Sequence, residues 1–391
     1  MIAIVGAGLG GLTLAVALAG QGIGCVVVER DPAPPDDGAG IQISPNAAAE
    51  LHALGLGAVF ATAVRPACRE IRRWRDDTVL GRTGLQDDRY AAPYYTLRRS
   101  ALAGALLDAV RRTQGPAAVR FGRRCAGVRD DGTGVVLRFD DGPELRADAV
   151  IGADGLHSVV RRVFGPEPPR YSGHLAGRAV LPMDEACPAA DRVVVWLGPG
   201  RHCVAYPIDG GRHLNLVVTA PAAEPRRRVV DPSAAYAGWH PVVRDLLGRA
   251  GPIECRPLYD RPPGPAWQRG RVVLLGDAAH PMLPFTAQGA AQAIEDAATL
   301  ARCLDDFPRY EAVRRPRAER VAESARAGLH RYHLPDGPEQ RQRDRALASA
   351  RPDALDWLYG HRAGAALGSR RSSETSSTRE AMPSFRKIWR R

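Results

Sequence analysis

Lysine is almost absent from this chain of 391 residues. Of the 54 basic side chains only Lys387 is a lysine, so arginine carries nearly all of the positive charge. The 43 acidic side chains leave a formal net charge of +11. The arginines are scattered, and no basic run is interleaved with aromatic residues, as a nucleic-acid-binding surface would require. We therefore expect no nucleic acid among the partners and interpret the charge as a basic surface with a basic tail.

Cysteine is also sparse, and long apolar runs are missing. The seven cysteines are odd in number, lie far apart and form no C-x-x-C pair. This spacing argues against a disulfide framework and against a zinc site, so we expect no metal and a reducing, cytoplasmic location. No apolar run reaches the roughly 18 residues that a membrane-spanning helix needs. We therefore expect no membrane partner.

The sequence does contain a glycine-rich turn directly after its first strand. Ile2–Val5 has the composition of a buried strand, Leu12–Ala19 that of a helix, and Gly24–Glu29 that of a second strand. The glycines of a G-x-G-x-x-G pattern are Gly6, Gly8 and Gly11. This strand–helix–strand unit predicts a dinucleotide site, because the middle glycine lets a pyrophosphate approach the backbone at the start of the helix.

An acidic residue ends the second strand of this unit. Glu29 is placed to accept hydrogen bonds from a ribose 2′-hydroxyl. Its charge would repel a 2′-phosphate, so the pattern predicts FAD or NAD and not NADP. No second G-x-G-x-x-G turn occurs in the chain, which favours one stably bound dinucleotide.

A second strand–loop–helix stretch lies in the last third of the chain. Arg271–Leu275 predicts a buried strand and Gln288–Leu304 a helix, with Asp277 and two prolines in the loop between them. The unpaired backbone N–H groups and the positive dipole end at the start of this helix favour a polar ligand. Glu295 and Asp296, further along the helix, are interpreted as part of a solvated face.

Two further segments carry candidate site residues. Asp148–Arg161 has the composition of an apolar strand that ends in Asp154 and Gly155. Another predicted helix begins at Arg98-Arg99-Ser100, where two cationic side chains oppose the positive end of the helix dipole. This unfavourable placement predicts an anionic partner near Arg99.

Three of these stretches, in this order, resemble motifs of the FAD-dependent aromatic hydroxylases, the single-component flavoprotein monooxygenases. They are Gly6–Gly11 with Glu29, Asp148–Arg161, and Gly276–Gly289. The chain looks most like the branch of salicylate hydroxylase and 3-hydroxybenzoate 6-hydroxylase. The resemblance extends from Met1 to about Gly360.

The resemblance implies an α/β fold. It has a Rossmann-like FAD-binding domain of the glutathione-reductase type, with a parallel sheet and a meander, an inserted antiparallel-sheet substrate domain, and C-terminal helices. Alternating stretches between Tyr171 and Pro262 also predict an antiparallel sheet. The expected domains are 1–68, 97–170 and 263–305 for FAD, 69–96 and 171–262 for the substrate, 306–360 for the helical segment, and 361–391 for a disordered basic tail.

Carried over to this chain, the motifs imply a set of residues that contact FAD. They are Gly6, Gly8, Gly11, Glu29, Arg30, Arg99, Asp154, Gly155, Asp277, Pro284, Gln288, Gly289 and Ala290. Relatives usually have a glycine where Ala287 stands, which implies a loop of altered mobility.

The resemblance also implies the reaction. NADH or NADPH transiently reduces FAD, O2 adds to form a flavin C4a-hydroperoxide, and the distal oxygen hydroxylates a small electron-rich aromatic. The substrate is a phenolic acid such as salicylate or hydroxybenzoate, or a natural-product aromatic, and the protein is a monomer or homodimer. A flavin-dependent oxidase or dehydrogenase, and a non-catalytic aromatic-binding flavoprotein, are the alternatives.

A proton acceptor near the substrate is expected, because the ring becomes more nucleophilic when it loses a proton. His213 is the first candidate, since it lies in an alternating strand of the covering domain. A structural or surface histidine is the alternative interpretation. Tyr206 is the second catalytic candidate, and the expected substrate contacts are Arg178, His213 and Pro284.

Overall fold

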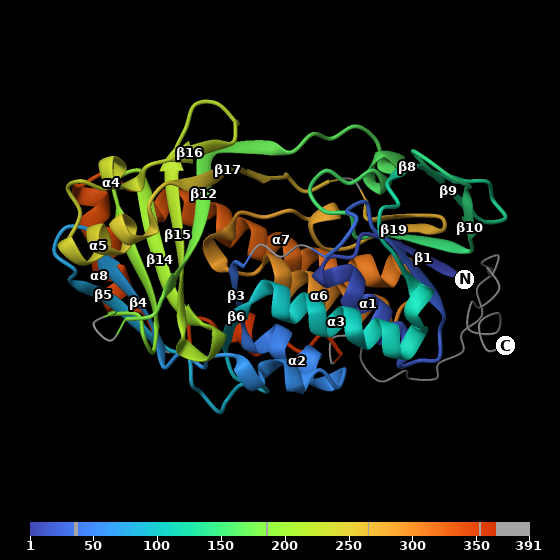
Figure 1. Ribbon diagram of the computed structural model, residues 1–391, viewed down its shortest axis with the longest axis horizontal. Coiled ribbons are helices and arrows are strands. Elements are labelled where there is room, and N and C mark those ends of the chain that lie inside the picture. The colour runs from blue at the N-terminus through green and yellow to red at the C-terminus, as the bar shows by residue number, and fades with distance from the viewer. Residues whose placement is uncertain (35–37, 185–186, 265, 352, 365–391) are drawn as a thin grey trace.

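The computed structural model describes residues 1–34, 38–184, 187–264, 266–351 and 353–364. Most of the expected tail, from residue 365 onward, lies outside these ranges. The described residues form two large sheets joined by helices, with the glycine-rich turn in one half and the alternating strands in the other (Figure 1).

Six strands form the first sheet. In spatial order they are β18 (Gln268–Arg269), β19 (Val272–Leu274), β11 (Ala149–Gly152), β1 (Ile2–Val5), β2 (Cys25–Val28) and β7 (Val119–Arg120). All neighbouring pairs are parallel except β18 with β19. The four central strands are buried along their whole length. Their unbroken apolar runs follow from this burial, because a parallel sheet is covered on both faces.

Helices from three distant parts of the chain pack against this sheet. α1 (Leu9–Ala19) contacts both α3 (Arg99–Gln114) and α6 (Gly289–Leu300). The helix expected to reach Leu304 ends at Leu300, and a turn follows it. Three antiparallel strands form a meander at the same end of the molecule (Figure 1). These are β8 (Cys125–Asp130), β9 (Val135–Phe139) and β10 (Leu145–Ala147).

Eight strands form the second sheet. In spatial order they are β16 (Arg228–Val230), β17 (Ile253–Asp260), β12 (Arg170–Pro182), β15 (His213–Pro221), β14 (Arg201–Ile208), β13 (Val193–Gly198), β4 (Cys68–Arg73) and β5 (Val79–Gly84). Only β13 and β4 are parallel neighbours. Residues alternate between two faces: Cys203 and Ala205 pack on α4 (Pro232–Ala235) and α5 (Pro241–Ala250).

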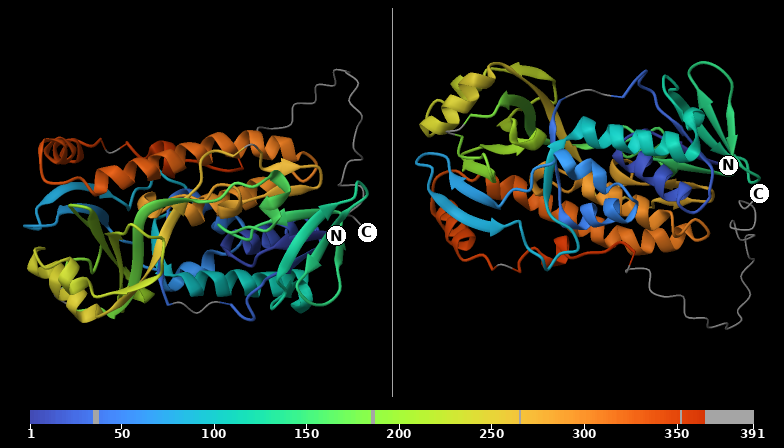
Figure 2. Two further views of the ribbon diagram at one scale, coloured as in Figure 1. Left: turned by 90° about the horizontal axis from the view of Figure 1, so that it is seen from above. Right: turned by 60° about the horizontal axis from the view of Figure 1, so that its bottom comes forward.

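The opposite face of this sheet, which carries Val204 and Tyr206, packs toward the rest of the molecule. α7 (Phe307–Tyr332) runs past both sheets and contacts α6 (Figures 1 and 2). The remaining elements are β3 (Gly40–Ile43), α2 (Pro45–Ala53), β6 (Tyr95–Arg98), α8 (Pro338–Ala348) and α9 (Asp356–Tyr359). The predicted α/β fold, with its parallel sheet, meander, antiparallel sheet and C-terminal helices, is confirmed. The domain boundaries stay predictions.

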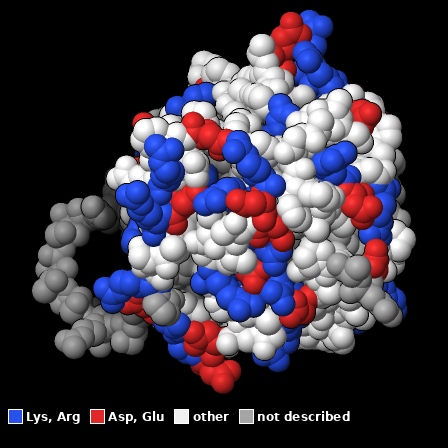
Figure 3. All heavy atoms as spheres, turned by 90° about the vertical axis from the view of Figure 1, so that its left-hand side faces the viewer, with Lys and Arg blue, Asp and Glu red and all other residues white. Residues whose placement is uncertain are grey.

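Charges of both signs are mixed on the surface. At the end of the molecule that holds α4, α5 and α8, basic and acidic side chains are interspersed (Figure 3). No helix in the described ranges is both long and apolar enough to cross a bilayer. Within the same ranges no three His, Cys, Asp or Glu side chains gather as metal ligands, and the seven cysteines are buried free thiols.

Candidate functional site

A cleft opens over the glycine-rich turn between β1 and α1. It encloses about 480 Å³ and is lined by this turn and by the ends of β2 and β11. A Cβ atom at Gly6 would collide with the Ala153 carbonyl, and one at Gly11 with the Gly6 carbonyl. At Gly8, in contrast, a Cβ would meet nothing within 4 Å. Gly6 and Gly11 therefore allow close packing of the backbone, whereas Gly8 leaves room for a ligand.

Glu29 and Arg30 lie at the wall of this cleft. The Glu29 carboxylate accepts hydrogen bonds from the backbone N–H groups of Ala7 at 2.7 Å and Asp31 at 3.0 Å. It thus ties the glycine-rich turn to the end of β2, while its remaining lone pairs stay available. Arg30 is exposed and lies 3.8 Å from Asp31.

Asp154 uses its side chain to shape the turn after β11. Its carboxylate accepts hydrogen bonds from the Ser158 hydroxyl and from the backbone N–H groups of Val159 and Val160. Burial raises its pKa, and these hydrogen bonds oppose the shift. Gly155 follows with φ of +76°, and a Cβ there would meet open space. Both residues line the cleft, with Gly155 as the open backbone position.

The cleft continues into a second chamber of about 420 Å³. Five residues line both spaces: Gly8, Leu9, Arg99, Ala153 and Gly155. One wall of the chamber is the loop before α6 with the start of that helix, and the other is the inner face of the eight-stranded sheet. The predicted residues Asp277, Pro284, Gln288, Gly289 and Ala290 all line the first wall.

Asp277 offers its carboxylate to the chamber. Among the described residues no hydrogen bond or ion pair to this carboxylate is found, although a Cβ at Gly289 would lie only 3.9 Å from its Oδ1. Although the Asp277 side chain is open to the chamber, desolvation by the surrounding protein raises its pKa, while His280 and Arg99 lower it. The carboxylate acceptor therefore lies beside the N–H groups that begin α6.

The sheet-side wall presents one histidine. His202, Val204 and Tyr206 alternate along β14, so all three side chains face the chamber. His202 Nδ1 lies 2.9 Å from Thr219 Oγ1 and 2.8 Å from Nε2 of His333. Burial, followed by His333 and His174, lowers the pKa of His202 well below its ordinary value. Burial also raises the pKa of the Tyr206 hydroxyl.

The structure brings together Arg178, Tyr206 and Pro284 but not His213. Arg178 is exposed on β12 and lines the chamber with the other two. His213 begins β15, outside the chamber lining, and its Nδ1 lies 2.9 Å from Asp209. His202 was not among the predicted site residues, although its spacing of four residues from Tyr206 in a strand places both side chains on one face.

A family model for an FAD binding domain matches residues 1–325. The chain belongs to this FAD-binding family. It is 44% identical over 381 residues to a 3-amino-4-hydroxybenzoate 2-monooxygenase of Streptomyces cremeus, covering 93% of this chain and 95% of that protein. It is 32% identical to a 3-hydroxybenzoate 6-hydroxylase of Polaromonas naphthalenivorans, covering 94% and 97%.

A solved structure shares the whole architecture. That of Klebsiella pneumoniae HpxO complexed with FAD and uric acid has a TM-score of 0.82 at 27% identity, covering 94% of this chain and 97% of that one. Together these similarities confirm the predicted family, cofactor and reaction type: the protein is an FAD-dependent aromatic hydroxylase.

The cleft and chamber fit FAD in both shape and chemistry. The open position at Gly8, beneath the start of α1, suits a pyrophosphate, whose charge is favoured by the positive end of the helix. The unpaired acceptor at Asp277 suits a polyhydroxyl chain, and the N–H groups at the start of α6 suit a ring that carries carbonyl groups. Contacts of individual residues with FAD stay predictions.

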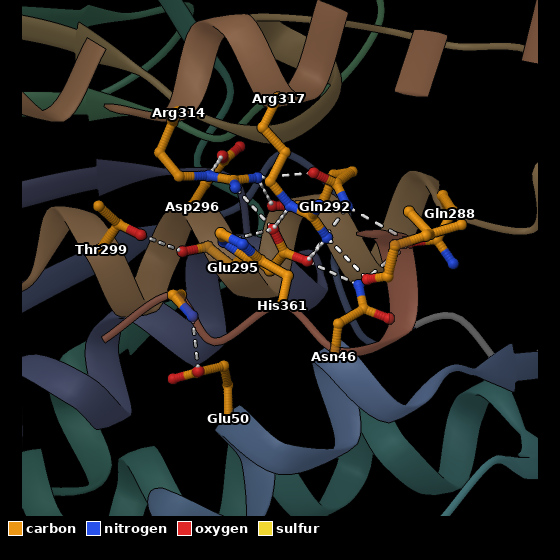
Figure 4. A network of polar contacts seen from close by, with 12 residues as sticks. Asn46, Glu50, Gln288, Gln292, Glu295, Asp296, Thr299, Arg314, Arg317 and His361 are labelled. Atoms are coloured by element: carbon orange, nitrogen blue, oxygen red, sulfur yellow. Dashed lines mark hydrogen bonds and ion pairs between the residues drawn. The ribbon is translucent and has the colours of Figure 1, made fainter. Parts of the chain in front are cut away.

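A buried polar network holds the α6 wall in place (Figure 4). The Gln288 side chain donates to Ser44 at 2.8 Å and accepts from Asn46 at 3.2 Å. Asn46 also donates to Glu295 at 2.6 Å. Ser44 therefore binds Gln288 instead of capping α2. These bonds hold the Gln288 side-chain amide against Ser44 and Asn46, so Gln288 fixes the position of the start of α6.

The expectation that Glu295 and Asp296 are solvated is wrong. Both are 0% exposed. Glu295 accepts from Arg314 at 2.6 Å and from Arg317 at 2.7 Å, while Asp296 accepts from Arg314 at 2.8 Å. Burial opposes ionisation of Asp296, yet His280 and Arg314 lower its pKa to about 2. The arginines of α7 thus neutralise two carboxylates inside the molecule.

The same network fixes the loop that carries Asp277. Asp296 accepts from the Gly276 backbone N–H at 2.8 Å and lies 2.6 Å from Nε2 of His280. Ala287, near the other end of the loop, adopts φ of 53° and ψ of 35°. This is the left-handed region, which glycine adopts with less strain than alanine.

Replacing Asp277 by Ala should weaken FAD binding about 10–100-fold, because a charge-assisted hydrogen bond contributes about 1.5–3 kcal/mol. The purified variant should be nearly colourless. The ratio of flavin to protein absorbance and a fluorescence titration with FAD measure the effect. Asp245→Ala, an exposed position on α5, is the control. Full flavin occupancy with an unchanged Kd in Asp277→Ala would remove this carboxylate from the site.

Proposed function

We propose that the enzyme hydroxylates a benzoate with hydroxyl and amino substituents, and that 3-amino-4-hydroxybenzoate is the first candidate. The observation that carries this proposal is the chamber itself, where His202, Tyr206 and Arg178 stand on one face of the sheet beside apolar walls. The Streptomyces cremeus relative, which matches nearly the whole chain, is named for that compound. A ring of this size suits a chamber of about 420 Å³.

His202 is the proton acceptor in this proposal. Its Nδ1 is engaged by Thr219 and His333, which leaves Nε2 for the substrate. Its lowered pKa keeps the ring neutral near pH 7, so that Nε2 is able to accept a proton from the hydroxyl or amino group of the attacked ring. Removing that proton increases the electron density of the ring.

Arg178 and Tyr206 complete the polar side of the chamber. Arg178 supplies a positive charge that attracts an aromatic carboxylate. The raised pKa of Tyr206 keeps its hydroxyl protonated, so it serves as a hydrogen-bond donor to the substrate. The assignment of both residues to the substrate, together with Pro284 on the opposite wall, is part of the proposal.

Apolar side chains line the space around these groups. Val204, Val217 and Met282 face the chamber and belong to the core that packs on the inner side of the sheet. Such walls exclude water, which would otherwise compete for the activated oxygen. When bound, FAD supplies the transfer of electrons from NADH or NADPH to O2 and of one oxygen atom to the ring.

Two finer expectations accompany the proposal. We propose a cytoplasmic location, supported by seven buried free thiols and no disulfide among the described residues. A monomer or a homodimer stays the expected assembly, which light scattering would decide.

A substrate screen tests the function. Purified holoenzyme is mixed with NADH or NADPH and, separately, 3-amino-4-hydroxybenzoate, 3-hydroxybenzoate, salicylate or 6-hydroxynicotinate. We expect 3-amino-4-hydroxybenzoate to stimulate NAD(P)H oxidation most and to give a product with one oxygen atom from ¹⁸O2, detected by mass spectrometry. The reaction without an aromatic acid is the control. Hydrogen peroxide as the sole product with every acid would overturn the proposal.

A further inference from the structure

A second histidine stands behind His202. His333 is the residue that ends α7, and it is only 9% exposed. Its Nε2 lies 2.8 Å from Nδ1 of His202, and Oγ1 of Thr219 lies 3.4 Å from the same His333 nitrogen. The two imidazole rings stack with their centroids 5.1 Å apart. His202 thus lines the chamber, whereas His333 lies outside the lining and contacts His202 from behind.

Two ring nitrogens at this distance share a single proton. Two hydrogens between them would collide, and two lone pairs would repel each other. If the proton is on His202 Nδ1, then His202 Nε2 is a bare acceptor toward the chamber. If it is on His333 Nε2, then a neutral His202 carries its hydrogen on Nε2 and acts as a donor. His333 therefore sets what His202 offers to the substrate.

We propose that His202 and His333 accept the substrate's proton as a pair, with His333 as the positioning residue. This proposal extends the proposed function and depends on it. The substrate hydroxyl gives its proton to His202 Nε2, and His202 Nδ1 gives its own proton to His333 Nε2. One O–H bond and one N–H bond break, and two N–H bonds form. The negative charge stays on the substrate oxygen, and the positive charge ends on His333.

The surroundings of His333 explain why the pair of His202 and His333 becomes positively charged only when an anion is bound beside it. Burial and the neighbouring His174 lower the pKa of His333 to about 3, while the Leu329 carbonyl at the end of α7 opposes this shift. The titratable groups that the structure places against the pair are His174 on β12, Tyr332 on α7 and Tyr236. None of them is a carboxylate, so the counter-charge has to come from the substrate itself.

His174 offers a matched control for this arrangement. Its ring stacks on His333 with centroids 4.5 Å apart and planes 11° apart, so it has the same packing role. Its Nδ1 faces the Ser172 carbonyl at 3.4 Å, and His174 is not part of the chamber lining. Because His174 itself lowers the pKa of His333, its replacement should leave ionisation in the chamber equally or more favourable, whereas replacing a positioning residue should abolish it.

The test measures ionisation of a bound phenol, without turnover. The probe is 4-hydroxy-3-nitrobenzoate, which has a nitro group in place of the amino group and a coloured phenolate. It is titrated into FAD-loaded wild-type enzyme, His333→Gln and His174→Gln over a range of pH, with no NADH or NADPH present. Difference spectra give the pKa of the bound hydroxyl, and the same titration in buffer gives the reference.

We expect the wild-type enzyme and His174→Gln to lower the hydroxyl pKa of the bound probe by at least about one unit. In His333→Gln, whose amide accepts a hydrogen bond but takes up no proton, that pKa should return to within about half a unit of the value in buffer. An equal shift in wild type and His333→Gln would overturn the pair, as would no shift in wild type. Because the shift is measured on bound probe without NADH or NADPH, it does not depend on whether 3-amino-4-hydroxybenzoate is hydroxylated.

Discussion

Replacing His202 by Gln should lower the rate of aromatic hydroxylation about 10²–10⁴-fold, the usual effect of losing a general base. Glutamine fills similar space and is polar, but it does not take up a proton. The variant should keep its flavin, because His202 lies on the sheet-side wall and not among the residues expected to hold FAD. Stopped-flow and steady-state kinetics with the best substrate of the screen, together with peroxide assays, measure the loss of product and the uncoupled oxidation of NAD(P)H.

His213→Gln is the matched control for this change. His213 begins the neighbouring strand of the same sheet and lies 2.9 Å from Asp209, beyond the chamber lining. It should keep its turnover within about twofold, since substitutions away from a site have small effects. If His213→Gln lost activity and His202→Gln kept it, the sequence-based assignment of the base to His213 would stand and the structure-based one would fall.

The pH dependence of wild-type activity also tests His202 as the base. His202 works in its neutral form, and its pKa is held well below the ordinary value of 6.5. Activity of the wild-type enzyme should therefore persist as the pH falls through 6.5 and disappear only when it approaches the lowered pKa. A loss of activity centred at or above about pH 6.5 would show that a different, ordinary histidine is the base.

The coming together of the three motif stretches was predictable because their signals are local. The turn from Gly6 to Gly11, the strand that ends at Asp154 and the loop around Asp277 each carry their chemistry within a few consecutive residues. A buried strand followed by a turn fixes where such residues lie, since the carboxyl ends of parallel strands meet at one edge of a sheet. The structure places all three stretches around one continuous cleft and chamber.

The substrate side was not predictable in the same way. A strand with alternating residues has two faces, and the pattern does not say which face meets the chamber or how far along the strand the chamber reaches. His213 lies on β15, yet the chamber extends only to Val217 and Thr219 of that strand. The neighbour His202 lies deeper because β14 pairs with β15 in antiparallel register, which is a property of the sheet and not of either strand alone.

The burial of Glu295 and Asp296 was missed for a related reason. A carboxylate in a helix is normally solvated, and the composition of α6 contains nothing that contradicts this. Their partners Arg314 and Arg317 are on α7, which folds back against α6 (Figure 4). In a sequence with 53 arginines, no single arginine signals such a role. Only the packing of the two helices distinguishes Arg314 from the other arginines of α7.

Replacing Arg314 by Met should therefore strongly destabilise the folded protein. The guanidinium is 0% exposed and pairs with Glu295 at 2.6 Å and with Asp296 at 2.8 Å. Removing it leaves the two buried carboxylates with fewer positive partners, which lowers the free energy of unfolding by about 3–5 kcal/mol. Thermal and urea unfolding of the flavin-loaded protein measure this loss. Arg331→Met, at an exposed position of the same helix, should change stability by less than about 0.5 kcal/mol.

The same substitution should change how stability depends on pH. Asp296 has a pKa lowered from 3.8 to about 2, so the folded state binds fewer protons than the unfolded state in that range. Its contribution to stability is complete above a pH of about 4 and disappears as the pH falls toward 2. Without Arg314 one of the groups that lower this pKa is gone, and unfolding by acid should begin at a higher pH than in wild type. An unchanged acid midpoint together with an unchanged urea midpoint would show that His280 and Arg317 alone neutralise the network.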